Sequence, residues 1–403
     1  MKKQTKTIIN IALLIGLLAI IFACSYFLKS SSMVFVVLKK GAIYALVAVS
    51  MNLLNGFTGL FSLGQAGFML IGAYTYAVFT IPVAERINVY QYFDGGIIQF
   101  TMPVILALIL AGIVAAIFAF LIGLPVLRLK SDYLAIATLG FAEIIRAILQ
   151  WDKLGPITNG SNMLRKFSTF DSIISNWRVD AQGNTTIFGE LCKSATWLPT
   201  FLSTMLPILI AGICIAIIVL IINSSYGRAF KSIRDDEVAA QAMGINLARH
   251  KMMAFCTSAF FAGVGGALLA MFQSMAKASD FKSGMTYEIL LIVVLGGIGS
   301  VTGSCLGAFL FVAASEWWLR GLDNGQFLGI VAPGLFRNGF RLVVFSLIIM
   351  FVVLFWRKGI MGDKEFDVER IIAGVKNIPT RFRQMIAWFK NLGKKKGEVS
   401  GND

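Results

Sequence analysis

Residues 55–67 read NGFTGLFSLGQAG and lie inside Gly41–Ala84, a stretch of 44 residues that carries no charge. At about 1.5 Å per helical residue, this stretch is long enough to cross a hydrocarbon core of roughly 30 Å twice. A plain helical hairpin would not place glycines and hydroxyl groups in its middle. Irregular backbone at membrane depth must be buried in protein or line a wet cavity, because lipid cannot satisfy freed N–H and C=O groups. The stretch therefore predicts a broken membrane segment that belongs to a transport path.

The composition of the chain is that of an integral membrane protein. Of its 403 residues, 57% are hydrophobic and only 14% are charged, whereas about a quarter are charged in soluble domains. Further charge-free runs are Ile8–Leu28, Gly95–Leu127, Ser194–Gly227, Met252–Ala276, Ile289–Ser315 and Leu342–Trp356. We expect an all-α polytopic membrane protein with about ten transmembrane crossings. The first run also resembles a secretory signal, but it is long for a signal core, so an uncleaved first helix is expected.

Basic residues are concentrated in four segments of the chain. These segments hold 21 of the 36 lysines and arginines and are Met1–Thr7, Leu124–Ser131, Ser224–Lys251 and Arg357–Asp403. With about ten crossings all four lie on one side, and the positive-inside rule makes that side cytoplasmic. Both termini are then cytoplasmic and residues 152–203 form an external loop. Lys29, Lys39 and Lys40 depart from this rule, because they fall on the external side.

A second glycine-rich break occurs in the other half of the chain, where residues 296–307 read GGIGSVTGSCLG. Gly299, Gly303 and Gly307 are spaced four apart, which also fits close helix packing alone, whereas Gly296 and Gly297 are expected to interrupt the helix. Glycine-broken or re-entrant segments in both halves of a chain point to a transporter's central path. The path residues that we predict are Asn52, Thr58, Ser62, Gln65, Gly296 and Gly297.

The cytoplasmic loop of residues 224–251 is compact, charged and helical in character. Asp235, Asp236 and Glu237 suit the positive end of a helix dipole, and Gly244 suits the end of the helix. Its alanines keep the predicted helix slim, so it could dock into the groove of a partner protein. A solvated connection between two membrane helices is the alternative.

Residues that could carry catalysis or bind a metal are sparse. The chain has one histidine, His250, and five cysteines without metal-like spacing, so we predict no catalytic residue, no metal and no cofactor. It also lacks the Gly-x-x-x-x-Gly-Lys-Ser/Thr phosphate loop, so a partner would have to bind ATP. Glu143 and Arg146 form a predicted intramembrane charge pair, three residues apart on one helical face. Such a pair is a functional candidate, although it can also serve structure by neutralising itself.

The order of four motifs resembles one family, the permease subunits of branched-chain amino acid ABC importers, and in particular the larger of their two permeases. The motifs are Asn52–Phe68 with Gly72–Tyr74, Leu127–Arg146 with Asn159-Gly160, Gly227–Asn246, and Leu295–Gly307. The second motif is the most specific for the larger subunit. The chain departs from the family at Gln65, where the family often has histidine. It also has a longer stretch after Asn162 and an extended tail beyond Gly362.

The resemblance implies a set of partners and a coupling site. It implies a second homologous permease, two cytoplasmic ABC ATPases, an external substrate-binding protein and a place in the bacterial cytoplasmic membrane. It also implies that a coupling helix touches an ATPase. The coupling residues carried over onto this chain are Arg234, Asp235, Asp236, Glu237, Ala239, Ala240, Met243 and Gly244. In the general importer pattern Glu-Ala-Ala-x-x-x-Gly, which would end at Gly244, Val238 occupies the position of the glutamate.

The expected function is therefore a permease subunit without an ATPase site of its own, which translocates branched-chain amino acids delivered by the binding protein. Related importers of urea, simple sugars or nucleosides share the architecture and stay open as alternatives. An ion-coupled secondary transporter is a more distant alternative, because it would need intramembrane carboxylates and the chain offers mainly Glu143.

The chain is expected to divide into a permease domain, residues 1–362, and a basic cytoplasmic tail, residues 363–403. Phe382, Met385, Ile386 and Phe389 lie on one helical stripe of this tail. Such a stripe predicts an amphipathic helix in the lipid headgroup region, and a frayed tail is the alternative.

Overall fold

The computed structural model describes residues 22–23, 25–26, 32–129, 131–178, 189–190, 192, 195, 197–318, 326–327, 330–331, 347, 350 and 359–362. All of them belong to one compact unit, Phe22–Lys364. The other unit, Met1–Ile21 with Glu365–Asp403, lies outside the described residues. Most of the runs Ile8–Leu28 and Leu342–Trp356 and the predicted tail helix also lie outside them.

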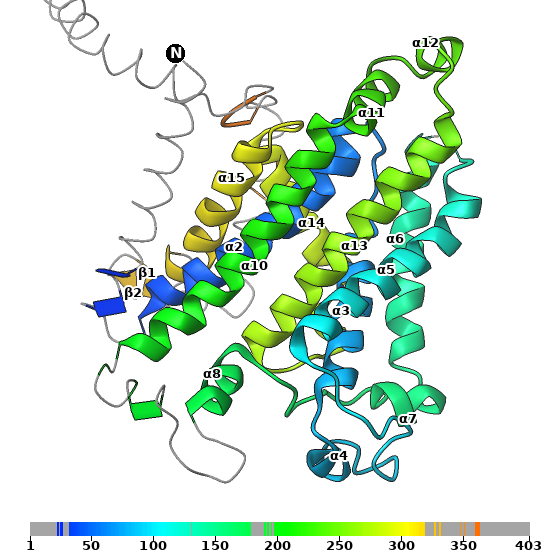
Figure 1. Ribbon diagram of the computed structural model, residues 1–403. Coiled ribbons are helices and arrows are strands. Elements are labelled where there is room, and N and C mark those ends of the chain that lie inside the picture. The colour runs from blue at the N-terminus through cyan, green and yellow to red at the C-terminus, as the bar shows by residue number, and fades with distance from the viewer. Residues whose placement is uncertain are drawn as a thin grey trace, which may run out of the picture. The chain divides into compact units, whose positions relative to one another are not determined.

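The described part of the chain is built from α-helices (Figure 1). The longer helices are α2 (Met33–Asn52), α3 (Gln65–Thr80), α5 (Val104–Val126), α6 (Ser131–Leu149), α10 (Leu198–Asn223), α13 (Leu247–Gln273), α14 (Ser283–Gly296) and α15 (Val301–Ala313). The shorter ones are α4 (Val83–Val89), α7 (Gly155–Thr158), α8 (Phe170–Arg178), α11 (Ser225–Asp235) and α12 (Glu237–Ala242). Two π-helical segments, η1 (Leu53–Phe57) and η4 (Ala314–Trp318), extend α2 and α15. The two-residue strands β1 (Gln326–Phe327) and β2 (Ile330–Val331) pair antiparallel.

Several of these helices are long and apolar enough to cross a membrane. Among the described residues there are four: α2 continued by η1, α5, α10 and α13. A fifth is possible if α6 and the turn Asp152–Thr158, bent by 62° from it, form one broken span. The apolar helices α14 and α15 are shorter. The prediction of an all-α polytopic membrane protein is confirmed, and the count of about ten crossings stays a prediction.

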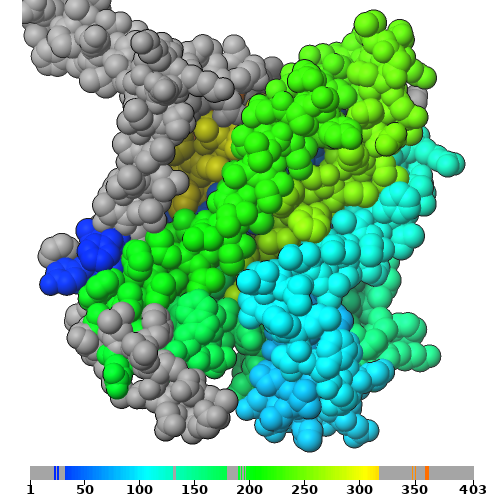
Figure 2. Space-filling model, in the orientation of Figure 1, coloured from blue at the N-terminus to red at the C-terminus, as the bar shows by residue number. Residues whose placement is uncertain are grey.

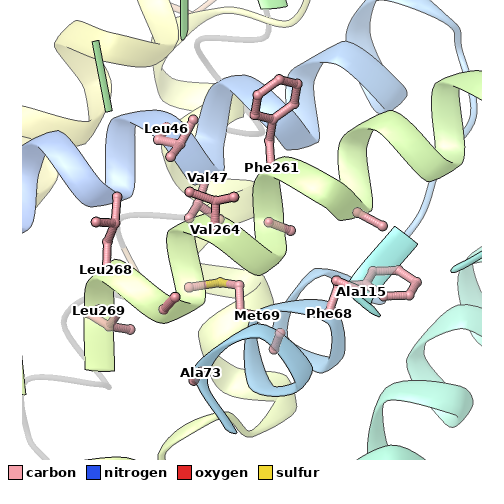
Figure 3. Packing of buried hydrophobic residues seen from close by; sticks show 14 of the residues in the cluster. Leu46, Val47, Phe68, Met69, Ala73, Ala115, Phe261, Val264, Leu268 and Leu269 are labelled. Atoms are coloured by element: carbon pink, nitrogen blue, oxygen red, sulfur yellow. The ribbon is translucent and has the colours of Figure 1, made fainter. Parts of the chain in front are cut away.

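The core of the unit lies around α13, which packs against α2, α3 and α5. Figure 3 shows Val264 and Leu268 of α13 beside Leu46 and Val47 of α2, with Met69 of α3 on the other side of α13. These side chains are almost fully buried. Shape rather than polarity holds such helices together in lipid, so close backbone approach matters.

Glycines allow α3 and α13 to approach each other closely. A Cβ atom on Gly266 would collide with the carbonyl oxygen of Met69, and one on Gly72 would collide with the carbonyl of Gly263. Neither position has room for any side chain. This contact fixes the position of α3 and therefore of the irregular segment that precedes it.

Candidate translocation and coupling site

The first glycine-rich break begins where α2 changes from an α-helix to the π-helical turn η1. The hydroxyl of Thr58 donates to the carbonyl oxygen of Leu53 at 3.0 Å, and the amide of Leu60 donates to the carbonyl of Leu54 at 3.1 Å. Gly59 has a positive φ of 76° and turns the chain toward α3. Carbonyls freed by the break thus find partners within the protein, as irregular backbone at membrane depth requires.

The second break separates α14 from α15. Gly297 and Gly299 adopt φ values of 120° and 87°, which side chains rarely tolerate. The hydroxyl of Ser300 then caps the new helix by accepting from the amide of Gly303 at 3.1 Å. The interruption predicted at Gly296 and Gly297 is therefore present.

Asn52 joins the two breaks. Its side-chain oxygen accepts from the amide of Gly299 at 2.8 Å. Its side-chain nitrogen donates to the carbonyl of Ser300 at 2.9 Å and to the hydroxyl of Ser304 at 2.8 Å. A Cβ atom on Gly56 would collide with this amide. We call these five residues, Asn52, Gly56, Gly299, Ser300 and Ser304, the break junction.

The remaining predicted path residues also lie in the interior of the chain. Gln65 donates to the hydroxyl of Ser50 at 2.7 Å, and the amide of Ser62 donates to the side-chain oxygen of Asn55 at 3.2 Å. Asn52, Thr58, Ser62 and Gln65 are each 3% exposed or less, and Gly296 and Gly297 are buried. The structure thus brings all six together around the two breaks, and their contact with a substrate stays a prediction.

A segment far along the chain closes the second break. The amide of Ile360 donates to the carbonyl of Leu295 at 2.8 Å, and the amide of Met361 donates to the carbonyl of Gly296 at 3.1 Å. These carbonyls belong to the last turn of α14, which has no helical partners for them. A Cβ atom on Gly297 would lie 2.8 Å from the carbonyl oxygen of Gly362. The turn Gly359–Gly362 therefore acts as a backbone cap on α14.

This cap predicts where the chain can be shortened. A chain that ends after Gly362 keeps the cap and should still insert and assemble, because the predicted tail helix is proposed to be dispensable. A chain that ends after Trp356 loses two hydrogen bonds worth about 1 kcal/mol each and leaves two carbonyls open. We expect its yield and thermal stability to fall clearly below those of the longer truncation, as measured by size-exclusion chromatography and thermal unfolding in detergent. Equal stability of the two chains would contradict the role of the cap.

The loop of residues 224–251 forms two short helices, α11 and α12. The carboxylate of Asp236 accepts from the amides of Val238 and Ala239 at 2.8 and 3.0 Å and so caps α12. Lys251 at the start of α13 holds Glu237 at 2.6 Å. The predicted short helix is present, and the chain leaves it at Gly244, where φ is 84°.

The tip of this loop presents apolar side chains outward. Val238 is 78% exposed and Met243 is 84% exposed, whereas Ala240 is buried at 4%. Ala239 is exposed as well. Large apolar groups that are exposed at the tip of a charged loop suit a protein partner. Of the two predicted alanines, only Ala239 is placed to meet one, and Val238 is an outward-facing residue that sequence reasoning left outside the candidate set.

Arg234, at the end of α11, reaches from the loop to the first break. Its guanidinium donates to the carbonyl oxygen of Gly56 at 3.2 Å and pairs with the carboxylate of Asp235 at 3.0 Å. A Cβ atom on Gly59 would lie 3.0 Å from Cγ of Arg234. The ammonium of Lys231 lies 5.6 Å from the ring centre of Phe57 in η1. The loop is thus in direct contact with the break junction.

Glu143 and Arg146 form the predicted ion pair, with a shortest distance of 2.6 Å. The other oxygen of Glu143 accepts from the amide of Ser283 at 3.2 Å, so the carboxylate also lies at the N-terminus of α14. A negative charge is favoured there by the helix dipole. Arg146 additionally donates to Gln150 at 3.3 Å. The pair therefore joins α6 to the first half of the second broken segment.

Two lysines that depart from the positive-inside rule have specific partners. Lys40 pairs with Glu316 of η4 at 2.5 Å and lies 5.4 Å from the ring centre of Tyr44. Lys39 donates to the hydroxyl of Ser203 at 2.9 Å. Sequence reasoning did not assign these roles, because the partners are more than 150 residues away.

A cavity of about 300 Å³ lies between α3, α5, α6 and α7. Its wall consists almost wholly of hydrocarbon and includes Ile71, Val78, Val114, Phe118, Ile145 and Ile157. The ammonium and carboxylate of an amino acid would find no partner there. The cavity suits an acyl chain better than a zwitterion. Within the described ranges there is also no cluster of three metal-binding side chains.

Comparison with known proteins places the chain among transport proteins. A family model described as "Branched-chain amino acid transport system / permease component" matches residues 33–356. The permease LivM of Salmonella typhimurium, named for high-affinity branched-chain amino acid transport, is 34% identical over 279 residues, which are 68% of this chain and 61% of LivM. The chain thus spans less than two thirds of that relative.

More distant relatives match as well. The permease LivH of Salmonella typhi, from the same kind of transport system, is 24% identical over 332 residues, or 81% of this chain and 94% of LivH. The nucleoside permease NupC of Lactococcus lactis is 22% identical over 258 residues, or 63% of this chain and 71% of NupC. No solved structure matches the chain.

Proposed function

The chain belongs to the family of permease components of branched-chain amino acid transport systems, and we propose that it is the transmembrane permease subunit of an ATP-binding-cassette importer for branched-chain amino acids. The observation that carries the proposal is the contact of Arg234, at the base of an exposed cytoplasmic tip, with the carbonyl of Gly56 in a broken membrane helix. A loop that only connected two membrane helices would not need to touch a break.

The mechanism follows from this contact. The partner ATPases bind and hydrolyse ATP, because this chain has no phosphate loop of its own. Their closure moves α12, and the cap at Asp236 keeps α12 attached to the end of α11. Arg234 passes the movement to Gly56 and therefore to the break junction. The two broken segments then move together, because Asn52 at the first break is hydrogen-bonded to Gly299 in the second break.

The partners in this proposal are a second homologous permease, two cytoplasmic ATPases and an external binding protein. The names of the relatives support the permease pair, because LivM and LivH both match this chain. Two of these partners are assigned to separate surfaces of this chain. The exposed tip of α12 meets an ATPase and the external loop, residues 152–203, meets the binding protein. With the four basic segments inside, both termini are cytoplasmic in the bacterial inner membrane.

Uptake by the reconstituted complex tests the substrate class. We expect proteoliposomes that contain the two permeases and the ATPases, supplied with binding protein outside and ATP inside, to accumulate radiolabelled leucine, isoleucine or valine. Urea, a simple sugar and a nucleoside serve as competitors. Accumulation of a nucleoside in preference to leucine would favour the alternative that the relationship to NupC supports. Uptake driven by an ion gradient without ATP would overturn the proposal.

The variant Ala239→Trp tests the coupling surface. Ala239 is exposed at the tip of α12, so a bulky ring leaves the chain folded but cannot enter a groove shaped for a methyl group. We expect transport-linked ATP hydrolysis to fall about tenfold, equivalent to about 1.4 kcal/mol. Ala248→Trp is the matched control, because Ala248 is also an exposed alanine in the same cytoplasmic region. Normal coupled hydrolysis in Ala239→Trp would contradict docking through α12.

A further inference from the structure

A small polar pocket lies between α8 and the start of α10. Its volume is about 150 Å³, and its wall is mostly polar, unlike the hydrocarbon wall of the cavity between α3, α5, α6 and α7. Its lining includes Asp171, Ile174, Ser175 and Arg178 of α8, and Thr200 and Ser203 of α10. A cavity of roughly 150 Å³ takes a molecule the size of benzene. This space, which we call the α8–α10 pocket, therefore has room for the polar end of a small solute.

The face of α8 that lines the pocket carries one charge of each sign. Asp171, Ser175 and Arg178 follow one another at spacings of four and three residues, so they lie on one side of the helix. Asp171 is in the first turn and Arg178 in the last, about 10 Å apart along the helix axis. Among the described residues no ion pair joins the two. A small molecule that carries both a negative and a positive group fits between them.

The guanidinium of Arg178 is not satisfied by the described part of the chain. Its Nε atom is buried and has no hydrogen-bond partner there, although the side chain lines a polar pocket. The helix dipole explains a cation in the last turn of α8, but it does not explain a donor that is buried and left open, which is costly. The acceptor that suits a guanidinium best is a carboxylate, which takes two of its N–H groups at once. The open donor therefore points to a carboxylate ligand.

Another part of the pocket is suited to an ammonium group. Ser203 is 4% exposed, and its hydroxyl accepts from the ammonium of Lys39 at 2.9 Å and donates to the carbonyl of Thr200 at 3.2 Å. The carboxylate of Asp171 lies close enough to Lys39 for their charges to interact. Asp171 is also exposed, and a carboxylate has acceptor sites for several donors. It can therefore bind a second ammonium that enters the pocket.

The pocket lies at the opposite end of α10 from the loop of residues 224–251. About 30 Å along the helix separate Ser203 from Asn223, where α10 ends before that loop, and this is roughly the thickness of a hydrocarbon core. Figure 2 shows α10 crossing the visible face of the unit from the end beside α8 to the end at which α11 and α12 lie. With the loop facing the ATPases, the pocket faces the side from which an importer receives its substrate.

We propose that the α8–α10 pocket binds the polar headgroup of a free α-amino acid, with its carboxylate at Arg178 and its ammonium at Asp171. A ligand with only a carboxylate would leave Asp171 without a ligand cation, and a ligand with only an amine would leave the donor of Arg178 open. The buried side chain of Ile174 gives the pocket an apolar wall beside these groups. This inference rests on the proposed function, for which it names a substrate site on the receiving side.

Equilibrium binding of labelled leucine to the assembled complex, without ATP and without binding protein, tests the role of Arg178. We expect Arg178→Gln to weaken leucine binding at least tenfold, because it removes a charged donor to the carboxylate. Arg165→Gln is the matched control, because Arg165 is exposed, donates to the sulfur of Met163 and does not line the pocket. The control should keep wild-type affinity. Equal affinities of the two variants would overturn the assignment.

Analogues of leucine that lack one charge separate the two roles. Isocaproate lacks the ammonium and isoamylamine lacks the carboxylate, and the wild-type complex should bind leucine at least tenfold more tightly than either. Asp171→Asn should remove the preference for leucine over isocaproate, and Arg178→Gln should remove the preference over isoamylamine. Isocaproate bound by the wild type as tightly as leucine would overturn recognition of the whole headgroup.

A thiol in the pocket tests the position of the ligand without removing a charge. Ser175→Cys places the thiol in the pocket, and Asn176→Cys places it on an exposed residue of the same helix outside the pocket. Reaction with an aqueous thiol reagent is measured above the labelling of the wild-type cysteines. We expect leucine to slow the reaction at position 175 at least tenfold and to leave the reaction at position 176 unchanged.

Failure of this inference is distinguishable from failure of the proposed function. If the wild-type complex takes up leucine with ATP and binding protein but leucine gives no protection at position 175, only the assignment of the pocket is overturned. If the complex takes up a nucleoside in preference to leucine, the proposed function is overturned, and the assignment of the pocket with it.

Discussion

Arg234→Gln is expected to uncouple ATP hydrolysis from transport while leaving the complex assembled. The wild-type guanidinium is the group that binds both Asp235 and the carbonyl of Gly56. A hydrogen bond from a charged donor contributes about 1.5–3 kcal/mol, or roughly a 10- to 100-fold change in an equilibrium. Arg234 is largely outside the core, so the chain should fold without it. Leucine uptake and substrate-stimulated ATP hydrolysis in proteoliposomes should therefore fall by at least tenfold.

The matched control for this variant is Arg228→Gln. Arg228 lies in the same helix, α11, and among the described residues its guanidinium donates to the hydroxyl of Ser225 at 3.1 Å rather than to a backbone group of either break. We expect Arg228→Gln to keep wild-type coupling. If Arg234→Gln retained full uptake at an unchanged ratio of transport to hydrolysis, movement of the loop would have to reach the breaks by another route.

Asn52→Leu is expected to destabilise the whole transmembrane unit and to abolish uptake. Leucine has a similar size but cannot replace the bonds to Gly299, Ser300 and Ser304. Each buried polar group left without a partner costs about 1–3 kcal/mol. The summed cost of several such groups is a large part of the free energy of unfolding of a typical folded domain, about 5–15 kcal/mol. The midpoint temperature of thermal unfolding should fall far below that of the wild type, and the yield of monodisperse protein should fall sharply.

The control for this variant is Asn223→Leu. Asn223 is the last residue of α10, as Asn52 is the last residue of α2, but it is exposed. The same substitution there should leave the unfolding midpoint nearly unchanged. A wild-type midpoint for Asn52→Leu would mean that the two breaks are held together without the amide.

Sequence patterns predicted the features that local chemistry determines. Glycine clusters located both breaks, because positive φ values at Gly59 and Gly297 are nearly confined to glycine. The acidic run located the start of α12, since a carboxylate at Asp236 can cap the helix. The spacing of Glu143 and Arg146 placed them on one face, where the structure pairs them.

What the sequence did not reveal depends on contacts between distant segments. Asn52 was predicted as a path residue, but no local pattern indicates that it binds Gly299. The hydrogen bond from the amide of Ile360 to the end of α14 could not be predicted either, because it joins two backbone groups and does not depend on the identity of the side chains. The pairing of Lys40 with Glu316 could be suspected only from two unexplained charges in apolar surroundings.

During biosynthesis, Asn52 is made well before Gly299, the residue to which it is hydrogen-bonded in the folded chain. The two residues are 247 positions apart, and ribosomes add about 5–20 residues per second, so the amide of Asn52 waits roughly 12–50 s for its partner. During that interval the nascent first half carries an unpaired polar group at the end of α2. Membrane-inserting machinery or a lipid-facing chaperone would have to shelter it, and slow translation of the second half would lengthen its exposure to quality-control proteases.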